Sequence, residues 1–123
     1  MVIFSKTAPA AVGPYSQAID VGDFVFLSGQ IPIDPTTGAI VEGGVPAQTR
    51  QIFSNIEAVL TAASLTLQNV VKTTVFMTDL GEFGTLNSVY AQYFPENPPA
   101  RSCVEVSALP KGAQVEVEVI AKR

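Results

Sequence analysis

The chain has 123 residues, 47% of them hydrophobic and 15% charged, and its net charge is −4. This length suits a single domain spanning residues 1–123, and an acidic chain is a poor match for the phosphate backbone of nucleic acids. One cysteine and no histidine exclude an internal disulfide, a Cys/His nucleophile pair and a zinc site.

The sequence also indicates the compartment in which the protein works. A lone cysteine is typical of a reducing compartment, and the N-terminal stretch MVIFSKTAPAAVGPYSQAI lacks the long apolar run of a secretory signal. No stretch reaches the roughly 18 consecutive apolar residues of a membrane span. We therefore expect a cytoplasmic protein with no membrane partner and no nucleic-acid partner.

The first half of the chain predicts a β-hairpin followed by a long helix. Residues 18–27 (AIDVGDFVFL) predict the hairpin, because the turn residues VGD separate two short runs of strand-forming residues. A second turn is expected at residues 34–38 (DPTTG). Pro46 fits the first turn of a helix, whose single apolar stripe consists of Ile52, Phe53, Ile56, Val59, Leu60 and Ala63.

The second half predicts a strand, a helix and two further strands. Residues 69–80 (NVVKTTVFMTDL) are rich in β-branched residues, and Asp79 with Glu82 has the spacing of a capping box for the next helix. Three prolines at 95, 98 and 99 end that helix. RSCVEVSAL and AQVEVEVIAK then predict two strands joined by PKG. This order indicates an α+β fold with two helices on one face of a mixed sheet.

The predicted strands are apolar on both faces. Phe24 and Phe26 point to one side of their strand, while Val25 and Leu27 point to the other. Two helices cannot cover both faces of a sheet. We therefore expect a second copy of the chain to cover the open face in a homo-oligomer.

The last two strands carry the residues best suited to chemistry. Period-two alternation places Arg101, Cys103 and Glu105 on one face of the first, and Glu116 and Glu118 on one face of the second. Valines alternate with these residues, and we expect the valines of both strands to face the helices. Arg101 and Glu116 are then both directed toward a cleft between subunits.

An arginine and a glutamate in such a cleft suit a small acid with an electrophilic carbon. The guanidinium holds a carboxylate through two parallel hydrogen bonds, and a partly desolvated glutamate can move a proton near neutral pH. The ordinary roles stay open: Arg101 in a salt bridge, Glu116 on a solvated strand face, and Cys103 as a small buried hydrophobe. The residues alone thus indicate an α+β oligomer with a candidate anion site.

Six stretches taken in order resemble the RidA/YjgF family of reactive-intermediate deaminases. They are GPYSQAI, LSGQIP, NVVKTTVFMTDL, NSVYAQYF, PARSCVEV and LPKGAQVEVEVIA, and they cover nearly the whole chain. The arginine in ARSCVEV, with a glutamate in the last strand, resembles the enzymatically active RidA subgroup. The resemblance implies a chorismate-mutase-like (YjgF-like) fold: a mixed six-stranded sheet, two helices on one face, and a homotrimer with an inner barrel.

The resemblance also implies a site and a reaction. Arg101 is expected to bind the carboxylate of a 2-imino acid, and Glu116 to position and polarise the attacking water. The implied reaction hydrolyses 2-iminobutanoate or 2-iminopropanoate, which arise from reactive enamines, to a 2-oxo acid and ammonia without metal or cofactor. Pro98 departs from the Phe-Pro pair of many members, and we expect only the rim to change. The other expected pocket residues, some from a neighbouring chain, are Tyr15, Ser28, Gly29, Asn87, Cys103 and Pro110.

Three other functions compete with this interpretation. A regulatory module that binds a small carboxylate without turnover needs an arginine, but it has little use for Glu116 beside an anionic ligand. A nucleic-acid role conflicts with the net charge of −4. A chorismate-mutase-like rearrangement rests on fold analogy alone, which is a weak argument for function.

Overall fold

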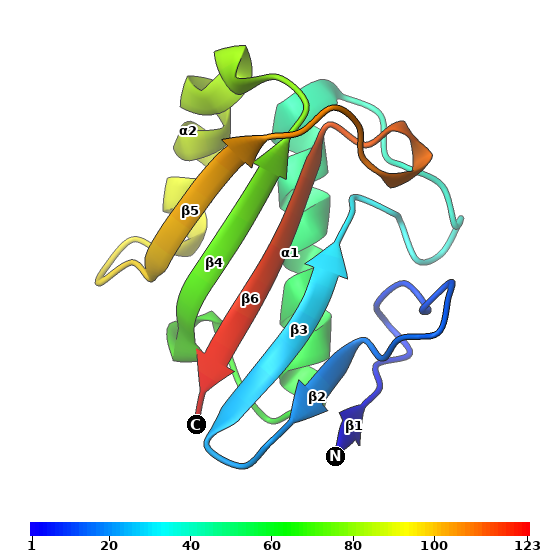
Figure 1. Ribbon diagram of the computed structural model, residues 1–123, viewed down its shortest axis with the longest axis vertical. Coiled ribbons are helices and arrows are strands. Elements are labelled where there is room, and N and C mark those ends of the chain that lie inside the picture. Colours follow the sequence, from blue (N-terminus) through cyan, green and yellow to red (C-terminus); the bar gives the residue numbers. More distant parts are fainter.

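The computed structural model describes residues 1–123 as one six-stranded sheet with two helices behind it (Figure 1). Three short 3₁₀ turns, η1 (Leu67–Asn69), η2 (Leu80–Glu82) and η3 (Pro110–Gly112), lie in the connections. The predicted element order is confirmed, and a short first strand is added to it. The strands and helices are β1 (Val2–Ile3), β2 (Ala18–Asp20), β3 (Phe24–Gln30), α1 (Gly44–Ala62), β4 (Val70–Met77), α2 (Phe83–Tyr93), β5 (Ala100–Glu105) and β6 (Val115–Lys122).

The sheet is mixed, as expected. Its strand order is β1-β2-β3-β6-β4-β5, and every neighbouring pair is antiparallel except β4 and β5. A parallel pair needs a crossover connection, which α2 provides. The last strand of the sequence, β6, therefore lies inside the sheet, whereas β5 forms one of its edges (Figure 1).

Both helices bury an apolar stripe, and their ends follow local sequence signals. α1 has Pro46 in its first turn and buries the stripe that the periodicity predicts. The predicted capping box does not begin α2, because Asp79 Oδ1 accepts a hydrogen bond from Gly81 N–H at 2.8 Å and so caps η2 instead. The prolines that follow α2 cannot continue a helix.

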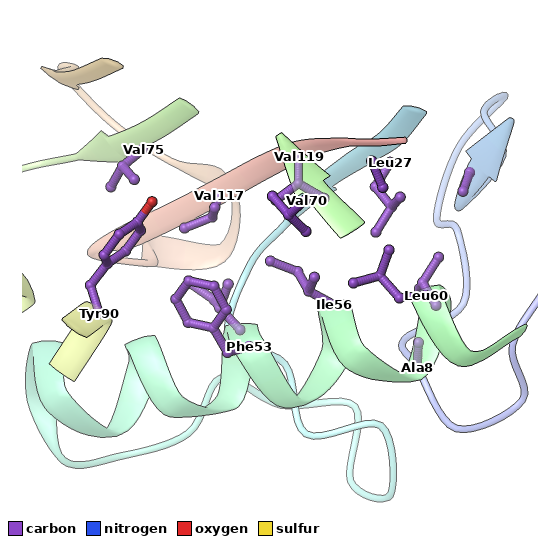
Figure 2. Packing of buried hydrophobic residues seen from close by; sticks show 14 of the residues in the cluster. Ala8, Leu27, Phe53, Ile56, Leu60, Val70, Val75, Tyr90, Val117 and Val119 are labelled. Carbon is purple, nitrogen blue, oxygen red and sulfur yellow. The ribbon is translucent and has the colours of Figure 1, made fainter. Parts of the chain in front are cut away.

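Phe53 lies at the centre of the hydrophobic core between the helices and the sheet (Figure 2). Its fully buried ring is stacked on Tyr93 with 4.5 Å between ring centroids. It meets Tyr90 and Phe94 edge-on at 5.7 Å and 5.6 Å. Buried valines of β4 and β6 form the sheet side of this core, so one aromatic side chain joins α1 and α2 above the strands.

The face of the sheet opposite the helices is partly apolar and exposed in the single chain. Val25 and Leu27 of β3 are buried beneath the helices, whereas Phe24 and Phe26 are 38% and 45% exposed on the other side. The predicted two-sided strands are therefore confirmed. We call this second side the open face; its apolar residues include Phe24, Phe26, Phe76 and Val104.

β5 places its side chains on the faces opposite to those expected. Its register with β4 pairs Cys103 with buried Val75, and Val104 with Phe76, and paired residues share a face. Arg101 and Cys103 therefore lie on the helix side, while Val104 is 44% exposed on the open face. The expectation for β5 is wrong because either Cys103 or Val104 could face the core. The pairing with β4 decides which of them does.

Replacing Phe53 by alanine should destabilise the protein by about 3–5 kcal/mol, because the lost ring leaves a cavity among three aromatic side chains. Urea denaturation at a fixed protein concentration measures this loss. Val21→Ala in the exposed turn after β2 is the control, with an expected change within about 0.5 kcal/mol. A loss below about 1 kcal/mol for Phe53→Ala would contradict its central place in the core.

Candidate functional site

β3 contains a bulge where it passes β6, at residues 28–29. Leu27 pairs with Val119, but Gln30 pairs with Val117, so β3 uses one residue more than β6 over this stretch. A bulge of this kind bends the strand and changes where its side chains point. Residues 28–29 were predicted to form part of the pocket wall. Because of the bulge, they do not take part in the regular pairing of β3 with β6.

The bulge leaves room for the carboxylate of Glu116. A methyl group built on Gly29 would collide with Glu116 Oε2 and would stand 2.9 Å from Glu116 Cδ. The Glu116 carboxylate can therefore occupy this place only while residue 29 is a glycine. Any larger residue at position 29 displaces the half-buried carboxylate from the place it now occupies.

A pocket on the open face is built around Glu116. Ser28 Oγ donates a hydrogen bond to the carbonyl of Ser16 at 2.7 Å, which ties β3 to the segment carrying Tyr15. Tyr15 is half exposed, and its hydroxyl accepts a hydrogen bond from Val12 N–H at 3.4 Å. We call this pocket the glutamate half-site; it is lined by Val12, Tyr15, Ser28, Gly29, Ile31, Pro110, Glu116 and Glu118.

The electrostatics of this pocket act on Glu116. Burial raises the pKa of the Glu116 carboxyl above its usual range, and the nearby charge of Glu118 raises it further. Removing a carboxylate from water disfavours its charged form, and a second carboxylate has the same effect. Glu116 therefore exchanges a proton closer to neutral pH than an exposed glutamate does, which suits a general acid or base.

Arg101 is held on the opposite face of the sheet by side chains of α2. Its Nη1 donates a hydrogen bond to Asn87 Oδ1 at 2.8 Å. Its Cζ lies 4.8 Å from the ring centroid of Tyr90 and 5.3 Å from that of Phe83. These contacts orient the guanidinium without neutralising its charge. We call the adjoining pocket the arginine half-site; it is lined by Asn87, Tyr90, Ala91, Phe94, Pro98, Pro99 and Arg101.

Buried Tyr90 and partly buried Cys103 complete the surroundings of Arg101. The hydroxyl of Tyr90 lies 2.8 Å from Thr73 Oγ1 of β4, which fixes the ring beneath the guanidinium. Cys103 packs against the core two residues further along β5. Burial raises the pKa of the Cys103 thiol, and the charge of Arg101 opposes that shift only in part. The thiol thus stays protonated at neutral pH and packs as a small side chain, because reactivity requires the thiolate.

One chain does not bring the two predicted catalytic residues together. Glu116 pairs with Phe76, which also pairs with Val104, so these three share the open face. Arg101 lies on the helix side, and β4 separates β5 from β6. The other predicted site residues divide in the same way: Tyr15, Ser28, Gly29 and Pro110 lie with Glu116, and Asn87 and Cys103 lie with Arg101.

Acidic side chains are otherwise spread over the structure. No group of three or more histidine, cysteine, aspartate or glutamate side chains is arranged to hold a metal ion. Neither α1 nor α2 combines the length and apolar character needed to cross a membrane.

The whole chain is similar to known proteins. The sequence model of the family described as Endoribonuclease L-PSP matches residues 5–123. A 2-iminobutanoate/2-iminopropanoate deaminase from Salmonella typhimurium is 51% identical over 124 residues, covering 98% of this chain and 96% of the relative. The chain belongs to the RidA/YjgF family.

Solved structures of this family share the fold. YyfA of Yersinia pestis, described as a conserved Rid family protein of unknown function, has a TM-score of 0.97 at 53% identity, covering 100% of this chain and 98% of YyfA. Escherichia coli TdcF, crystallised with bound serine, has a TM-score of 0.96 at 45% identity, with coverage of 100% and 98%. The expected YjgF-like fold is therefore confirmed for this RidA/YjgF protein.

The sequence does not predict the roles of Phe83 and Tyr90 beside Arg101. Both belong to the apolar stripe of α2, which by itself indicates core packing. The signal that could identify them is the register between β4 and β5, because it turns Arg101 toward α2. That register joins segments far apart in the chain, and local patterns do not reveal it.

The raised pKa of Glu116 has a consequence for stability. An acid whose pKa is higher in the folded state binds its proton more tightly there, so folding favours the protonated form. The resulting stability is fully present below the pKa of the unfolded chain. It is lost as the pH rises through the folded-state pKa of Glu116.

Glu116→Gln should therefore raise the melting temperature near neutral pH and change it little below about pH 4, because glutamine carries no charge at either pH. Scanning calorimetry of both proteins over this pH range measures the difference. Glu42→Gln, in the exposed loop before α1, should show no such pattern. A lower melting temperature for Glu116→Gln at neutral pH would contradict the cost assigned to the buried carboxylate.

Proposed function

We propose that this chain is a 2-iminobutanoate/2-iminopropanoate deaminase, a hydrolase that converts reactive 2-imino acids into 2-oxo acids and ammonia. The relative from Salmonella typhimurium carries this activity in its name at 51% identity. The observation that carries the proposal is the pair of half-sites. One presents a guanidinium with no acidic partner, and the other presents a carboxyl group with a raised pKa.

Arg101 binds the carboxylate of the substrate. A single hydrogen bond, to Asn87, occupies its guanidinium, so further N–H groups remain for the two parallel bonds that a carboxylate accepts. The serine held by Escherichia coli TdcF is a small acid with a nitrogen on the carbon next to its carboxylate. A 2-imino acid has the same arrangement, which supports a substrate of this class.

Glu116 manages the protons of the hydrolysis. It takes a proton from water while the water oxygen bonds to the carbon of the C=N group, and the imine nitrogen receives the electron pair of that bond and a proton. The resulting carbinolamine gives its hydroxyl proton to the Glu116 carboxylate, which returns a proton to the amine nitrogen. The C–N bond then breaks as the C=O bond forms, and ammonia leaves. The C=N carbon is already electrophilic, so acid–base catalysis worth about 10²–10⁴ in rate is the part left for a carboxyl group.

We also propose that the protein is a homotrimer with its sites between subunits. Arg101 and Glu116 lie on opposite faces of one sheet, so a complete site needs the arginine half-site of one chain against the glutamate half-site of the next. A head-to-tail contact of this kind forms a closed ring when the rotation between neighbouring chains closes, as it does in a trimer with threefold symmetry. The apolar open face, including Phe26 and Val104, supports the presence of a covering chain. The number three comes from the resemblance to the family.

The surroundings of the enzyme follow from composition. The family description names an endoribonuclease, but a net charge of −4 does not favour binding to an RNA backbone. We propose that the protein binds neither nucleic acid nor a membrane. A lone cysteine suits a reducing compartment, and we place the protein in the cytoplasm.

Arg101→Ala should lower kcat/KM for 2-iminopropanoate by at least about tenfold, because it removes charge-assisted hydrogen bonds to the carboxylate. An amino-acid oxidase generates the imine in the assay, and semicarbazide traps whatever remains unhydrolysed. Arg50→Ala, on the exposed side of α1, is the matched control and should behave like the wild type. A wild-type protein that leaves the trapped imine undiminished would remove the proposed function.

A small-carboxylate-binding module without turnover is the second candidate, since Arg101 alone supports binding. Glu116→Gln separates the two functions: it should lower kcat by about 10²-fold or more, because glutamine cannot accept the proton of water. Pyruvate, a 2-oxo acid product, should bind the variant within about threefold of the wild type by calorimetry, since the arginine grip is intact. Equal kcat values would show that Glu116 has no part in catalysis.

A further inference from the structure

Two buried amide side chains of α1 reach toward the glutamate half-site. Gln48 and Asn55 are 6% and 1% exposed, and their spacing of seven residues, two helical turns, puts them on one face of the helix. A buried amide without partners would cost stability. Both residues find their partners in the chain segments that border Glu116.

Gln48 fastens the segment that leads into β6. Its Oε1 accepts the backbone N–H of Gln114 at 2.8 Å, and its Nε2 donates to Gln114 Oε1 at 3.2 Å. Gln114 stands two residues before Glu116 and two residues after η3, which carries Pro110. Within η3, Lys111 has a φ of 57°, a left-handed conformation that is unfavourable for a side-chain-bearing residue. The Gln48 contact thus holds a segment with an unfavourable backbone.

Asn55 fastens the segment that follows the bulge of β3. Its Nδ2 donates to the carbonyls of Ile33 at 3.0 Å and Ile31 at 3.4 Å, and its Oδ1 accepts a hydrogen bond from Gln51 Nε2 at 2.9 Å. Ile31 lines the glutamate half-site, two residues from Gly29, where the Glu116 carboxylate lies. Because both ends of the amide have partners, its orientation is fixed.

We infer that Gln48 and Asn55 are positioning residues for the deaminase reaction: they hold both walls of the glutamate half-site against α1 and thereby fix the Glu116 carboxylate for proton exchange with water. The inference rests on the proposed function for its catalytic meaning. Neither residue lines the pocket; both act through the segments they hold. A misplacement of about 1 Å at a reacting group can lower the rate about 10²-fold. Arg101 is held by α2, so its binding of the substrate carboxylate does not change.

Gln48→Met removes the amide while keeping the length of the side chain. It should lower kcat for 2-iminopropanoate about tenfold and leave KM within about twofold, because Glu116 moves and Arg101 does not. Gln114→Ala loses only the side-chain contact, keeps the backbone N–H bond to Gln48, and should retain the wild-type kcat.

Arg123→Met is the matched control for lost stability. Arg123 Nη1 donates to the carbonyl of Ala63 at 3.0 Å, and Nη2 pairs with the Asp20 carboxylate, so Arg123 joins the far end of β6 to the end of α1 and to β2. This variant loosens β6 from α1, and also from β2, at the end away from Glu116, so it should melt at a lower temperature with kcat unchanged. An equal fall in kcat for Arg123→Met and Gln48→Met would make the role of Gln48 merely structural and overturn the inference.

Carbon-13 NMR titration of the Glu116 carboxyl gives a readout that needs no turnover. Two other titratable groups share its pocket, the carboxylate of Glu118 and the phenol of Tyr15. The groups facing it from β3 and β4 carry no charge; they are Ser28, Gly29 and Phe76. In the proposed trimer Arg101 of the next chain also faces Glu116, and it is present in every protein compared. The Glu116 pKa should fall toward the ordinary glutamate value in Gln48→Met, because water reaches the loosened pocket, and should not move in Arg123→Met.

The two readouts separate this inference from the proposed function. A lowered Glu116 pKa together with a lowered kcat in Gln48→Met supports the inference, and an unchanged titration overturns it. If the wild type fails to hydrolyse the imine while the titration still moves, the proposed function fails but the positioning of Glu116 stands. Asn55→Ala loosens the other wall and is expected to show the same shift, which keeps the test decisive if Gln48→Met does not fold.

Discussion

Opposite charges that touch within one chain neutralise each other, and the fold of this protein keeps Arg101 and Glu116 apart. The two side chains lie on opposite faces of a mixed sheet, with β4 between their strands. Arg101 therefore has a neutral amide and two aromatic rings as neighbours, so its charge stays available to an incoming carboxylate. Within one chain no guanidinium lies beside Glu116 to lower the pKa that burial and Glu118 raise.

Because the two residues are separated, each helix holds one half-site, and a complete site requires two chains. α2 orients the guanidinium through Asn87 and Tyr90, while α1 holds the two segments beside Glu116. A half-buried carboxylate and an exposed apolar sheet face lower the stability of the isolated chain. Covering that face with a second chain recovers roughly 25 cal/mol for each Å² of apolar surface, so in the proposed trimer the contact that stabilises the protein also completes the cleft.

Local patterns predict much of this fold, and long-range pairing decides the rest. The apolar stripe ending at Ala63 predicts α1, and the alternation of Phe26 and Leu27 predicts a strand that is apolar on both faces. Strand alternation indicates Arg101 and Glu116, and the resemblance to the family adds the other site residues. Their division between two faces depends on the register of β4 with β5, which a single sequence does not contain. Likewise, only the position of the Glu116 carboxylate explains why residue 29 is a glycine.

Refolding two inactive variants together tests the divided site most directly. Arg101→Ala chains retain the glutamate half-site, and Glu116→Gln chains retain the arginine half-site. In a ring of three, each mixed trimer has one interface with both intact residues, so an equimolar mixture should recover about a quarter of the wild-type activity. Native mass spectrometry verifies that mixed trimers form. A mixture of verified mixed trimers that is no more active than the separate variants would show that Arg101 and Glu116 do not meet across subunits.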